Sequence, residues 1–189
     1  LKEFTNSITG PEDQRFVGVA QYKSANTDVL TRIIAKISEK TPTQHIEEIA
    51  DAIGYEGAFY ISLSPEGYPA FSGGGCLSAR DLARFGLIFT RGGKNIAGQP
   101  FANEEFLSKS LSRPAPRLAE PKDWLRYSNH VMTDGRFLGH AGYGGQFLLV
   151  DTQTKTSISF LSVLENEDGY DDVYMGDVAA TLKNLLEEF

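Results

Sequence analysis

Two short stretches of this sequence hold residue types that could do chemistry. Tyr22, Ser24 and Asn26 stand at alternate positions just before an apolar segment of helical period. Far downstream, His140 and Gly142 precede Tyr143 and two further glycines. A phenol beside short polar groups suits proton transfer, and backbone N–H groups in a glycine-rich turn suit the stabilisation of developing negative charge. The two stretches therefore predict two parts of one catalytic site.

A nucleophile to match these parts is missing from the sequence. None of the 189 residues form the pattern Ser-x-x-Lys, in which a lysine on the next helical turn assists a nucleophilic serine. Ser24 is a poor substitute, because no lysine follows it three residues on. The chain also begins at Leu1 rather than at a methionine. We therefore expect the nucleophile segment in a missing N-terminal half or in another chain.

Helical periodicity predicts the elements that position Tyr22. One helix follows Asn26, a second runs from Pro42 to a stop at Gly54, and a third begins after a Ser78 cap. A weaker helix is predicted at 103–111. The apolar positions of the first three are Val29, Leu30, Ile33, Ile34 and Ile37; Ile46, Ile49, Ala50 and Ile53; and Leu82, Phe85, Ile88 and Phe89. The chain between the second and third helices, residues 55–77, is expected to be irregular.

From Leu125 onward the hydrophobic period changes from helical spacing to two. The pattern predicts strands at 125–133, 136–140, 146–151 and 156–164, and hence an antiparallel sheet of three or four strands. Asp134-Gly135 indicates a two-residue hairpin in which both residues take positive φ. A C-terminal helix is expected to cover the sheet with Val173, Val178, Leu182, Leu185 and Leu186.

These elements predict an α+β fold. A chain of 189 residues that is 41% hydrophobic and 23% charged suits a single domain with a substantial core. We expect one partial domain over 1–189, with a helical part at 14–121 and a sheet with its C-terminal helix at 122–189. The sequence contains the single cysteine Cys76, expected to pack as a small apolar side chain, so no intramolecular disulfide can form.

Charge and composition exclude several classes of partner. The net charge of −7 and the absence of lysine or arginine runs disfavour nucleic acid and anionic membranes. No apolar run approaches the roughly 18 residues of a membrane span. The three histidines lack metal-ligand spacing, so we expect no metal, and no cofactor is expected either. The sequence leaves localisation open.

Three segments carry a resemblance to a known family. They are Tyr-Lys-Ser-Ala-Asn-Thr-Asp-Val-Leu at 22–30, Gly-Gly-Gly-Cys-Leu-Ser-Ala-Arg-Asp-Leu-Ala-Arg-Phe-Gly at 73–86, and Gly-His-Ala-Gly-Tyr-Gly-Gly-Gln at 139–146. Over roughly 14–189 the chain resembles the serine β-lactamase-like, or penicillin-recognising, hydrolases. Among these it is most similar to 6-aminohexanoate-dimer hydrolases and class C-like esterases. The long block at 73–86 is the most specific of the three segments.

The resemblance implies an α+β fold in which a helical layer precedes the antiparallel sheet and its covering helix. It also implies acyl transfer by a serine with help from a lysine and a tyrosine. Tyr22 matches that tyrosine, and Ser24 holds the place where many relatives have asparagine, with Asn26 two residues on. His140-Ala141-Gly142 matches the Lys-Thr-Gly or His-x-Gly strand. There Gly142 would admit substrate, and the Tyr143 N–H would be one oxyanion donor.

Structural interpretations compete with these roles. Tyr22 is also consistent with a half-buried tyrosine before a helix cap, and His140 with a strand histidine that has no catalytic duty. Tyr127-Ser128-Asn129 spells the Tyr-x-Asn pattern of many relatives, but it lies in a predicted strand with no helix after it. Asp28 and Asp81 could be interpreted as paired carboxylates for acid–base catalysis, but both are expected in the first turns of helices, where the helix dipole favours a carboxylate.

Three functions remain open at this point. The leading hypothesis is the C-terminal part of a serine hydrolase acting on a small-molecule amide or ester. The second is a non-catalytic remnant of the fold that binds a peptide-like or acyl ligand or a partner chain, and the third is a purely structural α+β module. Without the N-terminal strands of the resembled fold, a sheet edge would stay unpaired and favour either a missing N-terminal half or self-association. The substrate class itself stays open among β-lactam, ester, peptide and linear amide.

Overall fold

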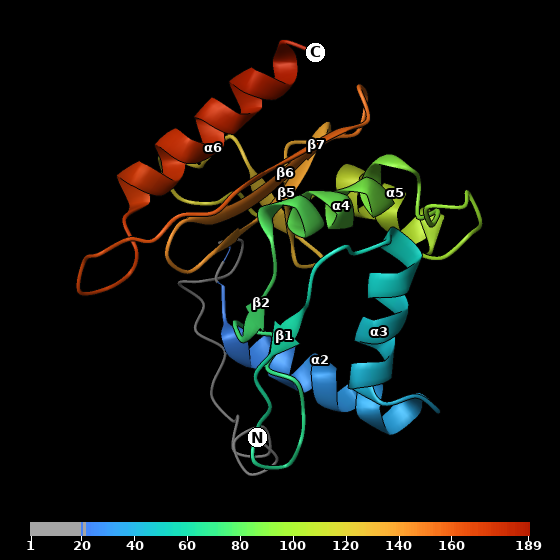
Figure 1. The fold of residues 1–189 in the computed structure, drawn as a ribbon. Coiled ribbons are helices and arrows are strands. Elements are labelled where there is room, and N and C mark those ends of the chain that lie inside the picture. Colours follow the sequence, from blue (N-terminus) through green and yellow to red (C-terminus); the bar gives the residue numbers. More distant parts are fainter. Residues whose placement is uncertain (1–19, 21) are drawn as a thin grey trace. The chain divides into compact units, whose positions relative to one another are not determined.

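The computed structural model of the protein describes residues 20 and 22–189 (Figure 1). The predicted helical part begins at 14, and its first few residues lie outside this range. The described chain divides into two compact units, one formed by residues 22–78 and the other by residue 20 with 79–189. The predicted boundary between the helical part at 14–121 and the sheet part at 122–189 therefore lies inside the second unit.

The first unit contains α2 (Ser24–Ile37), α3 (Pro42–Ile53) and a short antiparallel pair of strands, β1 (Tyr60–Ile61) and β2 (Gly75–Cys76). The Thr41 side chain caps α3 in a reciprocal capping box, and Gly54 ends the helix at φ 67°. Both boundaries agree with the prediction. The strand pair corrects the expectation of irregular chain at 55–77, and it leaves Cys76 exposed rather than packed.

Helix α2 differs from its prediction in two ways. It begins at Ser24, so Asp28 lies beyond the first turn and gains little from the helix dipole. The only buried residue of α2 is Thr31, whose hydroxyl donates to the Thr27 carbonyl at 2.9 Å. Four of the five predicted apolar positions are exposed instead: Leu30, Ile33, Ile34 and Ile37.

The second unit is built on a five-stranded antiparallel sheet in the order β3-β4-β5-β6-β7. Its strands are β3 (Arg126–Ser128), β4 (Val131–Thr133), β5 (Phe137–Gly142), β6 (Gln146–Asp151) and β7 (Thr156–Phe160). The prediction of three or four strands was too low, because 125–133 breaks at a turn where Asn129 and His130 both take positive φ. Among the described residues, β7 pairs with β6 alone.

The hairpin between β4 and β5 exists, but its turn is not the predicted one. Gly135 has positive φ and Asp134 does not. The Asp134 carboxylate instead accepts hydrogen bonds from the backbone N–H groups of Arg136 and Phe137, at 2.9 and 2.8 Å. This Asx-type turn fixes the start of β5, the strand that carries His140 and Gly142.

Helix α6 (Asp172–Glu187) covers one face of the sheet, and α4 (Ala79–Thr90) packs on the other (Figure 1). The core beneath α6 joins residues of three elements: Phe137, Phe147, Leu149, Met175, Ala179, Leu182 and Leu186. Val173 and Leu185, predicted for this inner face, are 67% and 40% exposed. They lie off the stripe that positions 175, 179, 182 and 186 form at helical spacing.

Glycine lets α4 approach the opposite face of the sheet closely. A Cβ at Gly86 would lie 2.9 Å from Val150 Cγ2 and 3.1 Å from Leu148 Cδ1. The hydroxyl of Ser157 on β7 donates to the Ala83 carbonyl of α4 at 2.8 Å. Helix α5 (Glu104–Ser112) follows α4 with an Asn103 cap, close to its predicted range. No helix of the described residues is long and apolar enough to cross a membrane.

Candidate active site

The first part of the predicted site lies at the start of α2. Tyr22 precedes the N-cap residue Lys23 and is 58% exposed. Ser24 is the first helical residue, and the Asn26 N–H donates to the Lys23 carbonyl at 3.0 Å. Ser24 and Asn26 are also exposed. The first unit therefore gathers Tyr22, Ser24 and Asn26 at one helix terminus, with their side chains accessible.

The second part of the predicted site lies at the end of β5. His140 pairs with Leu148 and Gly142 with Gln146 across the β5–β6 ladder. Because side chains alternate along a strand, His140 lies on the same face as Leu138, opposite the face of Phe137 that α6 covers. The imidazole therefore points to the side of the sheet on which α4 packs.

The turn after β5 leaves the predicted oxyanion donor available. Gly144 and Gly145 take φ values of 78° and 87°, which only glycine adopts readily. Their N–H groups donate to the carbonyls of Gly169 and Gly142 at 2.9 and 3.3 Å. Among the loop and turn hydrogen bonds of the described residues, none uses the Tyr143 N–H. Its side chain is 75% exposed.

A hydrogen-bonded brace that the sequence did not predict holds this turn. The Ser162 hydroxyl contacts the carbonyl of Gly145 at 2.9 Å, and the Tyr174 hydroxyl of α6 donates to Ser162 at 3.0 Å. The Gln146 side chain adds a hydrogen bond to the Ser162 carbonyl. Nothing in the pattern around Ser162 or Tyr174 signals this role, because the brace joins segments far apart in the chain.

The surroundings of His140 keep its imidazole neutral at pH 7. Burial, and to a smaller extent the charge of the neighbouring His130, lowers the pKa of His140 to about 4. The lysine of a Lys-Thr-Gly strand is a permanent cation at that pH. His140 therefore offers a hydrogen bond rather than a charge.

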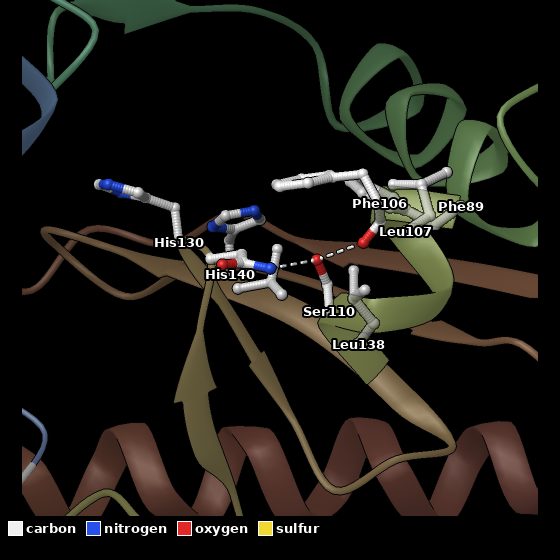
Figure 2. Close-up of a pocket in the computed structure, with 9 residues that line it drawn as sticks. Phe89, Phe106, Leu107, Ser110, His130, Leu138 and His140 are labelled. Carbon is white, nitrogen blue, oxygen red and sulfur yellow. Dashed lines mark hydrogen bonds between the residues drawn. The ribbon is translucent and has the colours of Figure 1, made fainter. Parts of the chain in front are cut away.

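A cavity of about 210 Å³ opens beside His140 (Figure 2). It is lined by residues of α4, α5, the β3–β4 turn and β5: Phe89, Phe106, Leu107, Ser110, Asn129, His130, Val131, Leu138 and His140. Sequence reasoning found His140 and missed the rest. The helical residues carry only an apolar pattern, and the turn was predicted as continuous strand.

The other residues considered for catalysis, Tyr127 and Asp81, make contacts within the fold. Tyr127 lies in β3 opposite Met132, and its N–H donates to the Pro116 carbonyl at 2.9 Å. Asp81 lies in the first turn of α4 as predicted, is 1% exposed, and accepts from Arg84 at 3.2 Å. No group of three or more histidine, cysteine or acidic side chains suited to a metal occurs in the described range.

Comparison with known proteins agrees with this fold. The chain belongs to the Beta-lactamase family, whose family model matches residues 10–180. A solved structure titled "Putative 6-aminohexanoate-dimer hydrolase from Bacillus anthracis" superposes with a TM-score of 0.74 at 20% sequence identity. That match covers 94% of this chain but 45% of the other, so this sequence spans less than half of that protein. No curated protein matches the chain. The family membership supports a hydrolase-like role in general terms.

Proposed function

We propose that this chain forms the C-terminal part of a serine hydrolase that acts on an amide or ester through an acyl-enzyme. The observation that carries the proposal is the accessible Tyr22, Ser24 and Asn26 group, together with the open Tyr143 amide next to His140 and Gly142, in a chain of the Beta-lactamase family. The likeness to a structure titled as a 6-aminohexanoate-dimer hydrolase favours an amide among the substrates considered.

In the proposed reaction, a Ser-x-x-Lys segment from outside these 189 residues supplies the nucleophile. The serine oxygen attacks the substrate carbonyl carbon, and its proton passes to the Tyr22 oxygen, which acts as the general base beside the lysine. The amine or alcohol leaves with that proton, and water then hydrolyses the acyl-serine ester. The Tyr143 N–H and the serine's own N–H stabilise the oxyanion, and loss of one such donor costs about 3 to 4 kcal/mol.

The remaining residues have binding roles in this proposal. Ser24 and Asn26 hydrogen-bond the substrate or the lysine from the first turn of α2. Gly142 lets the substrate approach the β5 backbone closely. His140 donates or accepts one hydrogen bond with the substrate. Among the described residues β7 pairs with β6 alone, and in this proposal its other edge binds the missing part of the domain or a second copy.

The test is labelling with a fluorescent serine-reactive phosphonate, performed on the polypeptide that includes the Ser-x-x-Lys segment. We expect the label on that serine, and Tyr22→Phe should slow labelling by about 10²- to 10⁴-fold, the usual contribution of a general base. Tyr60→Phe is the matched control, because Tyr60 is a comparably exposed tyrosine of the same unit at 68%.

Two results would contradict the proposal. Equal labelling rates for Tyr22→Phe and Tyr60→Phe would remove Tyr22 from the chemistry. Absence of label in a polypeptide that carries Ser-x-x-Lys would favour the alternative, a non-catalytic domain that binds a peptide-like ligand or a partner chain.

A further inference from the structure

The cavity beside His140 has the size of one chemical group rather than of a whole ligand. Complete small-molecule pockets measure roughly 300 to 1,000 Å³, whereas an apolar cavity of about 150 Å³ suffices for benzene. At about 210 Å³ the cavity suits a phenyl ring or a short alkyl chain with one polar substituent.

The walls of the cavity favour an uncharged occupant. Phe89 of α4, Phe106 and Leu107 of α5, and Leu138 of β5 provide apolar surface, and none of the described residues that line the space is a lysine, arginine, aspartate or glutamate. A charged group would lose its hydration there without gaining an ion-pair partner, and that loss is far more costly than the burial of a neutral polar group.

The polar groups of the cavity leave the imidazoles of His140 and His130 to bind a ligand, and burial keeps that of His140 neutral by lowering its pKa to about 4. The Ser110 hydroxyl donates to the Phe106 carbonyl at 2.8 Å and accepts from the Asn129 side-chain amide at 2.9 Å, so it is already engaged. No hydrogen bond joins the His140 ring to another described residue. Figure 2 shows this ring beside the cavity, with His130 and Phe106 around it.

The turn that closes one side of the cavity is held in a costly conformation. Asn129 and His130 have φ values of 49° and 64°, a left-handed conformation that costs most non-glycine residues about 1 to 2 kcal/mol and costs asparagine and histidine less. Such outliers cluster at ligand sites. Here the strained turn brings His130 and Asn129 to the cavity wall.

We propose that this cavity binds an uncharged phenyl- or alkyl-sized group of the substrate, oriented by one hydrogen bond to His140. The inference rests on the proposed function and narrows its substrates to amides or esters that carry a neutral apolar group on the side next to His140. Substrates with a carboxylate or an ammonium at this position are excluded.

The binding test uses benzamide as the neutral probe and benzoate and benzylamine as charged probes of the same size. Binding is followed by NMR through the imidazole signals of His140 and His130, with His45, which does not line the cavity, as the reference. We expect saturable shifts of His140 and His130 with benzamide, and at least tenfold weaker binding of both charged probes. Equal binding of the three probes, or shifts confined to His45, would overturn the proposal.

Variants on α5 and the preceding loop sharpen the test. Phe106→Ala, at a cavity residue that is 54% exposed, should weaken benzamide binding at least fivefold without unfolding the protein. Phe101→Ala is the matched control, because Phe101 is 39% exposed and lies outside the cavity lining. Equal affinities for the two variants would place benzamide elsewhere.

The binding test and the labelling test fail separately. Benzamide bound beside His140 in a protein that no phosphonate labels would overturn the proposed hydrolase and keep the cavity as a ligand site. Serine labelling, together with benzamide affinity that is unchanged by Phe106→Ala, would support the proposed hydrolase function and contradict the proposal that the cavity binds a substrate group.

Discussion

Two polar regions of the second unit differ in how their polar groups are partnered. At the end of β6, Asp151 is fully buried and its carboxylate meets the Arg136 guanidinium and the Gln153 N–H, at 3.1 and 2.8 Å. On β5, the His140 imidazole borders a cavity, and no hydrogen bond joins it to another described residue. The first arrangement suits stability, and the second suits a ligand.

A second paired cluster strengthens this comparison. The buried Lys122 ammonium donates to the Tyr170 hydroxyl at 2.7 Å and to the Asp172 carboxylate at 2.8 Å, and Tyr170 also donates to Asp172. Burial opposes the charge of Lys122, but these two hydrogen bonds outweigh it and raise the lysine pKa. The cluster therefore stays charged and ties the chain before β3 to the start of α6.

The largest effect is expected from breaking the Asp151 pairing. Asp151→Ala should lower the free energy of unfolding by up to about 3 kcal/mol, because the N–H groups of Gln153 and Thr154 and the Arg136 guanidinium lose the fully buried carboxylate that accepts their hydrogen bonds. The control is Glu105→Ala, which removes an exposed ion pair with Lys109 and should cost less than about 1 kcal/mol. Urea unfolding measures both variants, and equal losses would refute the assigned role of Asp151.

The Asp151 contribution also has a defined pH dependence. Burial opposes ionisation of this carboxyl, but hydrogen bonds from Arg136, Gln153 and Thr154 outweigh it and hold the pKa below 3.8. Protons bind the unfolded state first as the pH falls, so the stabilisation is complete above pH 3.8 and is lost as the pH falls through the lower folded-state pKa.

The next largest effect is a loss of folding stability at low pH that is caused by His140. Its pKa is about 4 in the folded protein against 6.5 ordinarily, so the unfolded chain takes up a proton first as the pH falls. The stability of the wild type should therefore drop between pH 6.5 and pH 4, with His140 responsible for about 2 kcal/mol at pH 4.5. His140→Gln should remove that part of the drop.

Urea unfolding of wild type and His140→Gln at pH 7 and pH 4.5 checks this expectation. Parallel stability profiles for the two proteins would mean that His140 is protonated normally in the folded state. In that case the surroundings of His140 would not disfavour its charged form, and the region around His140 would no longer differ electrostatically from the Asp151 pairing.

The sequence predicted the elements whose signals are local. Helix α3 has its capping box at Thr41 and its stop at Gly54, and β6 is an apolar run bounded by turn residues, so both were located from nearby residues alone. The Asn129-His130 turn was missed because the hydrophobic period of two was taken to run through 125–133 without a break, although asparagine is a residue type that tolerates the left-handed conformation of turns.

The sequence predicted the motifs of the candidate site one by one, but not the side chains that surround them. Tyr22 and His140 were identified by resemblance to family motifs, and the structure adds the exposure of Tyr22 and the shielding of His140. The cavity depends on contacts between α4, α5, the β3–β4 turn and β5, and periodicity does not specify which side chains of separate elements meet.

The smallest effect is expected from relieving left-handed backbone strain. It compares the turn at His130, which lines the cavity, with the turn at Lys155, which does not. His130→Gly should raise the free energy of unfolding by about 0.5 kcal/mol, because glycine relieves the left-handed strain although it loses more backbone entropy on folding. The control is Lys155→Gly, since Lys155 has a φ of 61° in the β6–β7 turn, away from the cavity lining. Both variants should gain similar stability in urea unfolding, and only His130→Gly should weaken benzamide binding. If both kept wild-type affinity, the strained turn would contribute nothing to the cavity, and the unpaired region would differ from the paired one in hydrogen bonding alone.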